Sequence, residues 1–135
     1  MRDIASNIAV RAVIAPVVVS DNTAAVGTVI DRLGFDSLAY VIATGTLADA
    51  DATFTVLLEE SDASGSGFTA VADADLIGTE ADASFTFAND GVVRKLGYRG
   101  HKRYTRLTIT PAGNSGSAPL AAVAILGHAA SRPVS

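Results

Sequence analysis

The 135-residue chain has no cysteine and no tryptophan, and its aromatic residues are five phenylalanines and three tyrosines. Without cysteine, the chain forms no disulfide and has no thiol nucleophile or iron–sulfur ligand. Small secreted domains often depend on disulfides, so this absence favours an intracellular origin. Because 49% of the residues are hydrophobic and few are aromatic, we expect a core of Ala, Val, Ile and Leu in thin, closely packed layers.

Long apolar runs are also missing from the chain. A membrane-spanning helix needs about 20 consecutive apolar residues, and no window of the sequence approaches this. The apolar stretch near the start is interrupted by Arg11 and Pro16, and no small-residue cleavage site follows it, so we expect no signal peptide. At this length we expect one domain that buries about two-thirds of the surface of the unfolded chain.

Acidic residues are absent from positions 91–135. That stretch has seven Lys and Arg, whereas residues 1–90 carry all fourteen acidic and three basic side chains, so charges of −11 and +7 sum to −4. This sorting predicts a surface with charged poles that docks onto a charged partner. Six of the seven cations form what we call the basic strip: Arg94, Lys95, Arg99, Lys102, Arg103 and Arg106.

The basic strip has three possible interpretations. Phosphate binding requires several cations on one surface with aromatic platforms, and Tyr98 and Tyr104 are available. The net charge of −4 weakens attraction to nucleic acid, so nucleic acid is not the expected partner. An acidic protein surface, including the acidic part of a second copy, fits the charges better. The third interpretation is a set of solvated strand faces.

Strand patterns dominate the chain, and helix patterns are poor. Short segments rich in apolar or β-branched residues alternate with Gly-rich turns, and Asp73–Asp82 could hold a single helical turn. Eight to nine short strands predict an all-β fold, an antiparallel β-sandwich of jelly-roll type, over residues 23–135. The best-defined strands are Ser37–Thr44, Thr53–Glu60, Phe68–Val71, Ser84–Ala88, Val92–Arg99, Tyr104–Thr110 and Leu120–Leu126.

Individual strands carry more detailed expectations. The composition of Ser37–Thr44 and Leu120–Leu126 is typical of strands buried on both faces. Alternation in Tyr104–Thr110 places Thr105, Leu107 and Ile109 on one side, toward the core. The Asp90-Gly91 pair predicts a hairpin between Ser84–Ala88 and Val92–Arg99.

Residues 1–22 differ from the rest and are expected to form an extended N-terminal arm. Ile8–Val19 is rich in β-branched residues, but Pro16 removes a backbone donor in its middle. Such a segment suits an edge strand or an arm. We therefore expect this arm to add little to the core of its own subunit and to pair with a neighbour.

The sequence contains no convincing catalytic or metal-binding pattern. His101 and His128 have no accompanying nucleophile motif, so both are expected to be structural. The aspartate pairs Asp49/Asp51 and Asp73/Asp75 lack the glycine and terminal glutamate of a calcium loop, which favours solvated turn residues over cation ligands. We expect no enzymatic activity, no cofactor and no metal.

Several segments together resemble a family of small structural proteins of tailed bacteriophages and prophages. They are Leu33–Gly45, Phe54–Asp62, Lys95–Gly116 and Ala122–His128, and the resemblance covers about Val26 to Val134. It implies an auxiliary capsid protein, of the decoration or cement type, with a jelly-roll-like β-sandwich. The implied partners are the major capsid protein and further copies of the chain, as a trimer or dimer. The implied location is the capsid surface of the virion, after synthesis in the bacterial cytoplasm.

Two other functions share most of these features. One is a sugar- or ligand-binding β-sandwich displayed on the virion, which would need an exposed aromatic platform or a calcium site. The other is a tail or head–tail joining protein. The basic strip is the surface that we expect to dock in the decoration role.

Overall fold

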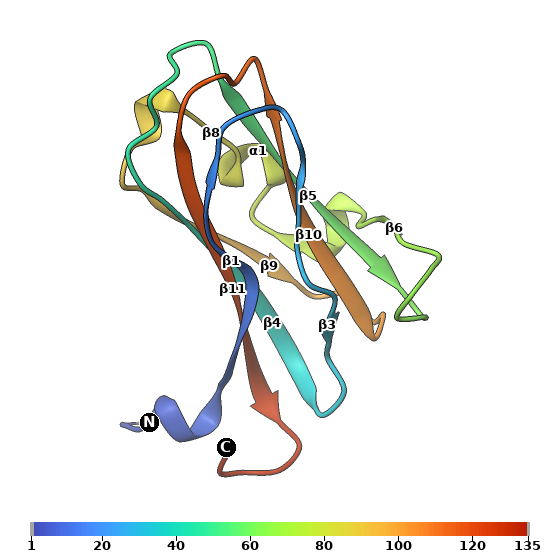
Figure 1. Cartoon of the computed structure of the whole chain (residues 1–135). Helices are drawn as coiled ribbons and strands as arrows, with labels where there is room; N and C mark the ends of the chain where they lie inside the picture. The colour runs from blue at the N-terminus through green and yellow to red at the C-terminus, as the bar shows by residue number, and fades with distance from the viewer. Residues whose placement is uncertain (1, 135) are drawn as a thin grey trace.

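A computed structural model of the chain, in which residues 2–134 are described, is a sandwich of two antiparallel sheets (Figure 1). Sheet A has the strand order β1-β11-β4-β9-β7, and sheet B has the order β2-β10-β5-β6, with β3 also paired to β10 and β8 to β5. The strands are β1 (Ala9–Val19), β2 (Ala25–Val26), β3 (Ile30–Asp31), β4 (Phe35–Thr44), β5 (Thr53–Ser61), β6 (Thr69–Ala70), β7 (Leu76–Ile77), β8 (Phe85–Thr86), β9 (Val93–Tyr98), β10 (Tyr104–Ala112) and β11 (Ala118–Ala129).

The strand order is that of a jelly roll. The first and last strands are neighbours in sheet A, and the chain crosses between the sheets after β1, β3, β4, β6, β7, β8, β9 and β10. Two interleaved Greek keys produce this arrangement. The antiparallel jelly-roll sandwich predicted from the spacing of the strands is therefore confirmed.

The core lies between the two sheets and consists mostly of aliphatic side chains. In β10, Thr105, Leu107 and Ile109 are all fully buried, as their alternation predicts. Phe54 and Phe85 stack with their ring centroids 4.8 Å apart. A fully buried polar contact crosses the core: the hydroxyl of Tyr40 on sheet A lies 2.6 Å from the hydroxyl of Thr105 on sheet B.

The structure incorporates most of the expected N-terminal arm into the sandwich. Within residues 1–22, strand β1 pairs with β11 from Ala9↔Leu126 to Val19↔Ala118, and Ala9, Val13, Ile14 and Val19 are buried in the core of the same chain. Its β-branched residues supply apolar area that sheet A can bury, so the segment is not separate from the domain. Pro16 lies within a register shift between Ile14 and Val17 on the edge strand, where a missing backbone donor is tolerated.

The hairpin predicted at Asp90-Gly91 is wrong. Strand β8 pairs with β5 in sheet B, whereas β9 pairs with β4 and β7 in sheet A. The chain instead leaves β8 through a short 3-10 helix, Phe87–Asn89, whose Asn89 side chain accepts the Thr86 N–H at 2.9 Å. Asp90 accepts a bond from Leu47 N–H, which anchors the crossing.

Helical structure is confined to single turns. The 3-10 helices are Ala5–Asn7, Asp73–Asp75 and Phe87–Asn89, and α1 spans Glu80–Ala83. The turn expected within Asp73–Asp82 is thus present as two short pieces separated by β7. None of the helices within residues 2–134 has the length and hydropathy needed to cross a bilayer.

Candidate docking surfaces

The six residues of the basic strip do not share one surface. Lys95 points out from sheet A, whereas Arg106 points out from sheet B, on the opposite side of the sandwich. Arg94 lies against α1, where its guanidinium donates to the Asp82 carbonyl at 2.7 Å. Arg99, Lys102 and Arg103 lie in the loop between β9 and β10, or at its boundaries.

Three of the six cations are neutralised by acidic groups of the same chain. Lys102 pairs with Asp62 at 2.6 Å, and Arg103 pairs with Asp31 at 2.8 Å. On sheet B, Arg106 and Glu59 are cross-strand partners and pair at 2.8 Å. Among residues 2–134, Lys95 is the member of the strip with neither a hydrogen bond nor an ion pair. The other two members are Arg94 and Arg99, which donate to backbone carbonyls.

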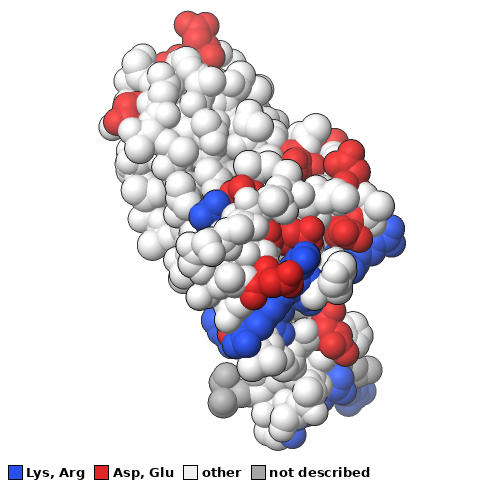
Figure 2. All heavy atoms as spheres, turned by 90° about the vertical axis from the view of Figure 1, so that its right-hand side faces the viewer, with Lys and Arg blue, Asp and Glu red and all other residues white. Residues whose placement is uncertain are grey.

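The charge separation in the sequence does not become a separation in space. In Figure 2, basic groups in the lower part of the molecule lie directly against acidic groups. Antiparallel pairing between β5 and β10 and the turn at β3 place the acidic first part of the chain beside the basic strip. The charged poles expected from the sequence are therefore absent from this side, which carries alternating charges.

The loop that holds Arg99, Lys102 and Arg103 is fixed to the body of the sandwich. Arg32 donates to the carbonyls of Lys102 and Gly100 at 2.8 and 3.2 Å, and its guanidinium stacks over the Tyr98 ring at 5.0 Å. The Tyr98 hydroxyl donates to Glu60 at 2.7 Å and accepts from Lys102 N–H. Burial and the Glu60 carboxylate raise the pKa of Tyr98. Its hydroxyl therefore stays protonated, as this donor role requires.

The most unusual surface is the outer side of sheet A, which we call the apolar face. Three rows of cross-strand neighbours form it. They are Val10–Ile125–Ala39–Gly97–Ile77, Ala12–Val123–Val41–Lys95 and Ala121–Ala43–Val93. Lys95 is the one charged residue among these twelve. Val93, Ile77 and Val10 are 67%, 59% and 59% exposed.

The outer side of sheet B has the opposite character. Its two central strands present Thr55, Thr108, Thr110 and the Arg106–Glu59 pair, with Leu57 as their large apolar residue. Antiparallel sheets with one solvated side usually alternate apolar inward and polar outward residues. Sheet B follows this rule and sheet A breaks it. The prediction that β4 and β11 are buried on both faces is wrong for the isolated chain, because their outer side chains face solvent.

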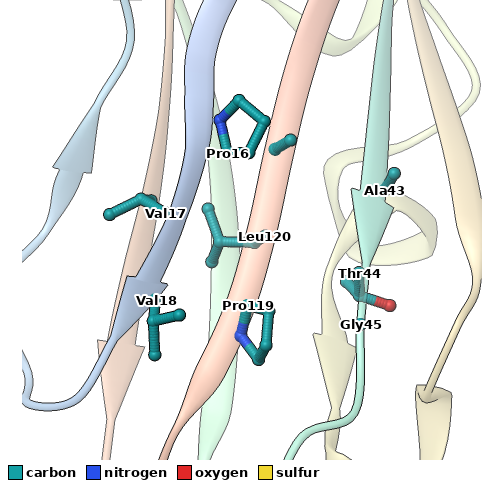
Figure 3. Close-up of a pocket in the computed structure, with 9 residues that line it drawn as sticks. Pro16, Val17, Val18, Ala43, Thr44, Gly45, Pro119 and Leu120 are labelled. Carbon is teal, nitrogen blue, oxygen red and sulfur yellow. The ribbon is translucent and has the colours of Figure 1, made fainter.

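Two hollows mark the ends of the apolar face. One has a volume of about 420 Å³ and lies across β1, β11 and β4, where Figure 3 shows Pro16, Val17 and Val18 beside Pro119 and Leu120, with Gly45 on the far side of β11. The other, of about 600 Å³, is lined by Ile8, Ala39, Ile77, Ile125, His128 and Lys95, among others. Both hollows are open and lined mostly by apolar side chains.

The remaining candidates from the sequence have structural roles. His128 has a positive φ of 50° and hydrogen-bonds to the Ser37 hydroxyl at 2.9 Å. Asp49 accepts the Ser115 N–H and hydroxyl at 2.8 and 3.0 Å, and these bonds with that from Asp51 N–H lower its pKa. Asp73 and Asp75 belong to a 3-10 turn. Residues 2–134 hold no group of three side chains placed to ligate a metal.

The apolar face was not identified as a site from the sequence. Its signal was present in Ser37–Thr44 and Leu120–Leu126, whose outward positions are Ala and Val where a solvated strand would have polar residues. What the sequence could not provide was the pairing order. Only the jelly-roll topology brings these two strands together with β1 and β9 into one continuous surface.

Comparison with known proteins supports the fold. No protein-family model and no curated sequence matches the chain. The crystal structure of PBSX exported protein XepA aligns with a TM-score of 0.59 at 19% identity over 94% of this chain and 39% of XepA. The chain thus spans about two-fifths of the length of XepA. At this identity the likeness shows a shared fold.

A second solved structure aligns less well. It is the C-terminal family 22 carbohydrate binding module of Clostridium thermocellum Xyn10B, with a TM-score of 0.45 and 12% identity over 96% of this chain and 92% of that module. A similarity of this size supports no inference about function.

Proposed function

We propose that the chain is a structural protein of a tailed-phage or prophage particle, a decoration protein that binds the outside of the capsid at subunit junctions and stabilises the head. The observation that carries the proposal is the wide apolar face of sheet A, because an exposed apolar surface of this kind is typical of a subunit of a larger assembly and not of an isolated globular protein. The jelly-roll sandwich fits the resemblance to phage structural proteins. The structural neighbour XepA, a phage-derived protein, supports the same broad class.

A sugar-binding role is less well supported by the surface. Carbohydrate sites commonly stack sugar rings on exposed aromatic side chains, as the aromatic ring offers a flat apolar face. Within residues 2–134, Tyr40 and Tyr98 are buried, and Phe87 is the one exposed large aromatic side chain. A single ring is a poor platform. Assembly therefore accounts for the surface better than ligand capture does.

In this proposal, contact with the capsid is made by the loop between β9 and β10. This loop is held rigidly by Arg32 and Tyr98, and it presents Arg99 and His101 to solvent. Lys102 and Arg103 already form ion pairs with Asp62 and Asp31, which reduces the net positive charge of the loop. An acidic capsid surface would then be recognised by few close charge pairs, repeated over many copies of the chain.

Reconstitution onto particles tests the proposed role. Shells of the particle that lack this chain are mixed with purified chain and imaged by cryo-EM. We expect additional density of this sandwich on the outer surface at subunit junctions, and shells that withstand a higher temperature. Density confined to the tail or to the head–tail joint would instead support the joining role and contradict decoration.

Charge reversal tests the proposed loop. We expect Arg99→Glu to lower the fraction of particle sites that the chain occupies. The remaining binding should also depend less on salt, because one of the charge pairs that salt screens, over about 8 Å at physiological ionic strength, is lost. Arg132→Glu, which reverses an exposed arginine outside the basic strip, is the matched control. Equal occupancy and equal salt response for Arg99→Glu, Lys102→Glu and the unmodified chain would mean that the loop is only a solvated surface.

A further inference from the structure

We propose that the apolar face of sheet A is the docking surface for a second copy of this chain, so that two sandwiches stack face to face as a symmetric dimer. The inference concerns the free protein and does not depend on the capsid role. A dimer without capsid binding and capsid binding without a dimer are therefore distinguishable results.

The apolar face is continuous across sheet A. The apolar row from Val10 through Ile125, Ala39 and Gly97 to Ile77 crosses all five strands without a charged or hydroxyl side chain. Contiguous exposed apolar patches on monomeric soluble proteins rarely exceed a few hundred Å², and larger ones mark interaction sites. The composition of β4 and β11 is that of strands covered on both sides, and a facing sheet supplies the missing cover.

The area of this surface matches what a specific dimer needs. Strands lie about 4.8 Å apart and rise about 3.3 Å per residue, so the outer side of sheet A covers about 570 Å² over ten residues each of β1, β11 and β4 and the six residues of β9. Two such sides remove about 1,100 Å² from solvent, which is above the level of about 1,000 Å² that a specific interface should reach. The surface is large enough for a partner of its own size.

The side chains suit close packing of sheet on sheet. Ala39, Ala43 and Ala121 are small, and Gly97 has no side chain, so another sheet can approach to the usual spacing of about 10 Å. Of the larger side chains, Val10, Ile77 and Val93 lie on strands toward the two sides of the face. Ile125, Val123 and Val41 lie on the inner strands β11 and β4, among the small residues. Lys95 is on β9, off the centre, where its long chain can carry the ammonium group to solvent.

The edges of sheet A favour stacking over edge-to-edge pairing. On one edge, β1 has register shifts between Ala12 and Val17 and contains Pro16, which cannot donate. On the other edge, β7 has only two residues. Short, irregular or proline-containing edges are poor templates for adding a strand. Sheet A can therefore associate with another sheet through its outer face more readily than through its edges.

A second copy fits this face better than a charged partner does. In a two-fold contact the same patch serves both sides, so an uncharged apolar face meets its own equivalent and no charge has to be matched. An acidic partner surface would find a single cation, Lys95, among the twelve residues of the face. The polar outer side of sheet B remains free in such a dimer.

Sedimentation velocity on the full chain, over concentrations from about 1 to 100 µM, tests the inference. We expect a dimer whose dissociation constant rises at least about a hundredfold in Ala43→Glu and in Val93→Glu, because each variant buries a carboxylate without a partner. Both positions are exposed in the single chain, so neither substitution removes core packing. Added salt should leave the dimer intact or strengthen it, since the contact is apolar.

Thr55→Glu is the matched control. It places the same charged side chain at an exposed strand position on the outer side of sheet B, and we expect it to leave the dimer unchanged. Circular dichroism and the unfolding midpoint of all three variants report whether the fold is kept. Ala43 and Val93 are neighbours on different strands, β4 and β9, so comparison of their unfolding midpoints shows whether either strand is disturbed.

Three results would overturn the inference. The first is an unmodified chain that stays monomeric throughout the concentration range. The second is a dimer that both face variants leave as tight as the control does. The third is a monomeric chain whose attachment to capsid shells is lost in Ala43→Glu and Val93→Glu, which would assign the face to the capsid protein.

Discussion

Arg103 and Asp31, which are 72 residues apart in the sequence, form a two-bonded ion pair: the guanidinium Nε and Nη2 donate to the two carboxylate oxygens, each at 2.8 Å. Asp31 also accepts the Leu33 N–H at 3.0 Å. The pair ties the start of β10 to β3, which is also its strand partner. A long-range contact of this kind converts two oppositely charged stretches of sequence into one neutral surface.

This pair predicts a dependence of stability on acid. The bond from Arg103 lowers the pKa of Asp31 to about 2. The pKa of an aspartate in an unfolded chain is about 3.9. A lowered pKa in the folded state stabilises the fold above about pH 4 and ceases to do so as the pH falls toward about 2. We expect Asp31→Asn to lower the urea midpoint slightly near neutral pH, because both side chains are more than 40% exposed.

The measurement compares urea midpoints of Asp31→Asn and the unmodified chain between about pH 2 and pH 7. The gap between them should close toward the acid end. Asp36→Asn, at an exposed carboxylate with no hydrogen bond among residues 2–134, should show no gap at any pH. A gap for Asp31→Asn that is constant with pH would show that charge is not its source.

The buried bond between Tyr40 and Thr105 predicts a coupled effect on stability. Burial raises the pKa of Tyr40, so its hydroxyl remains neutral and bonded to the Thr105 hydroxyl at 2.6 Å. Tyr40→Phe and Thr105→Val should each cost about 1–3 kcal/mol, since each leaves one buried hydroxyl without a partner. The double variant should cost less than the sum by at least about 0.5 kcal/mol. Chemical denaturation of the four proteins measures this, and strict additivity would contradict it.

Leu107 tests where the core lies. This side chain is 0% exposed at the centre of β10, and Leu107→Ala should lower the free energy of unfolding by about 2–5 kcal/mol. Leu33 is 68% exposed, and Leu33→Ala should change the free energy of unfolding by less than about 0.5 kcal/mol. Urea unfolding distinguishes the two. Similar effects for both variants would be incompatible with the packing described.

Gly27 tests the close approach of β2 to its neighbours. Its N–H donates to the Leu107 carbonyl at 2.7 Å, and a Cβ there would lie 2.5 Å from that oxygen and 2.6 Å from Val13 Cγ1. We expect Gly27→Ala to cost about 1–3 kcal/mol through overpacking. Gly65 has open space around it, so Gly65→Ala should leave the unfolding midpoint nearly unchanged. An unchanged midpoint for Gly27→Ala would mean that the backbone shifts there freely.

Much of the fold could be predicted from local patterns. The alternation of Thr105, Leu107 and Ile109 identified the buried side of β10, and the turn residues bounded β4, β5 and β9 to within one or two residues. These signals are local, because side-chain direction in a strand depends only on parity. The jelly roll followed from the number and spacing of such strands.

Pairing between distant segments was harder to predict. Asp90-Gly91 has the composition of a hairpin turn, but Phe85 packs on Phe54 in sheet B, which draws β8 away from β9. No strand next to residues 1–22 in the sequence suggested itself as their pairing partner. The structure pairs β1 with β11, at the opposite end of the sequence. Local sequence carries no information on either choice.

The candidate site illustrates the same limit. The basic strip was chosen because its six residues are near one another in sequence, but two sheets with opposite outer sides separate Lys95 from Arg106. The apolar face was overlooked because its residues come from five separate strands. Charge and hydropathy along a chain predict a surface only after the strand order is known.

The position of β11 governs when this protein can fold. It is the last of these eleven strands to be synthesised, yet it lies inside sheet A, between β1 and β4. Until it is made, β1 has no neighbour in its sheet, and one side of β4 is open. Until β11 is made, nascent chains must therefore keep β1 without its partner in sheet A and β4 paired on its β9 side alone. A truncation before Ala118 would remove β11 and so separate β1 from β4, β9 and β7.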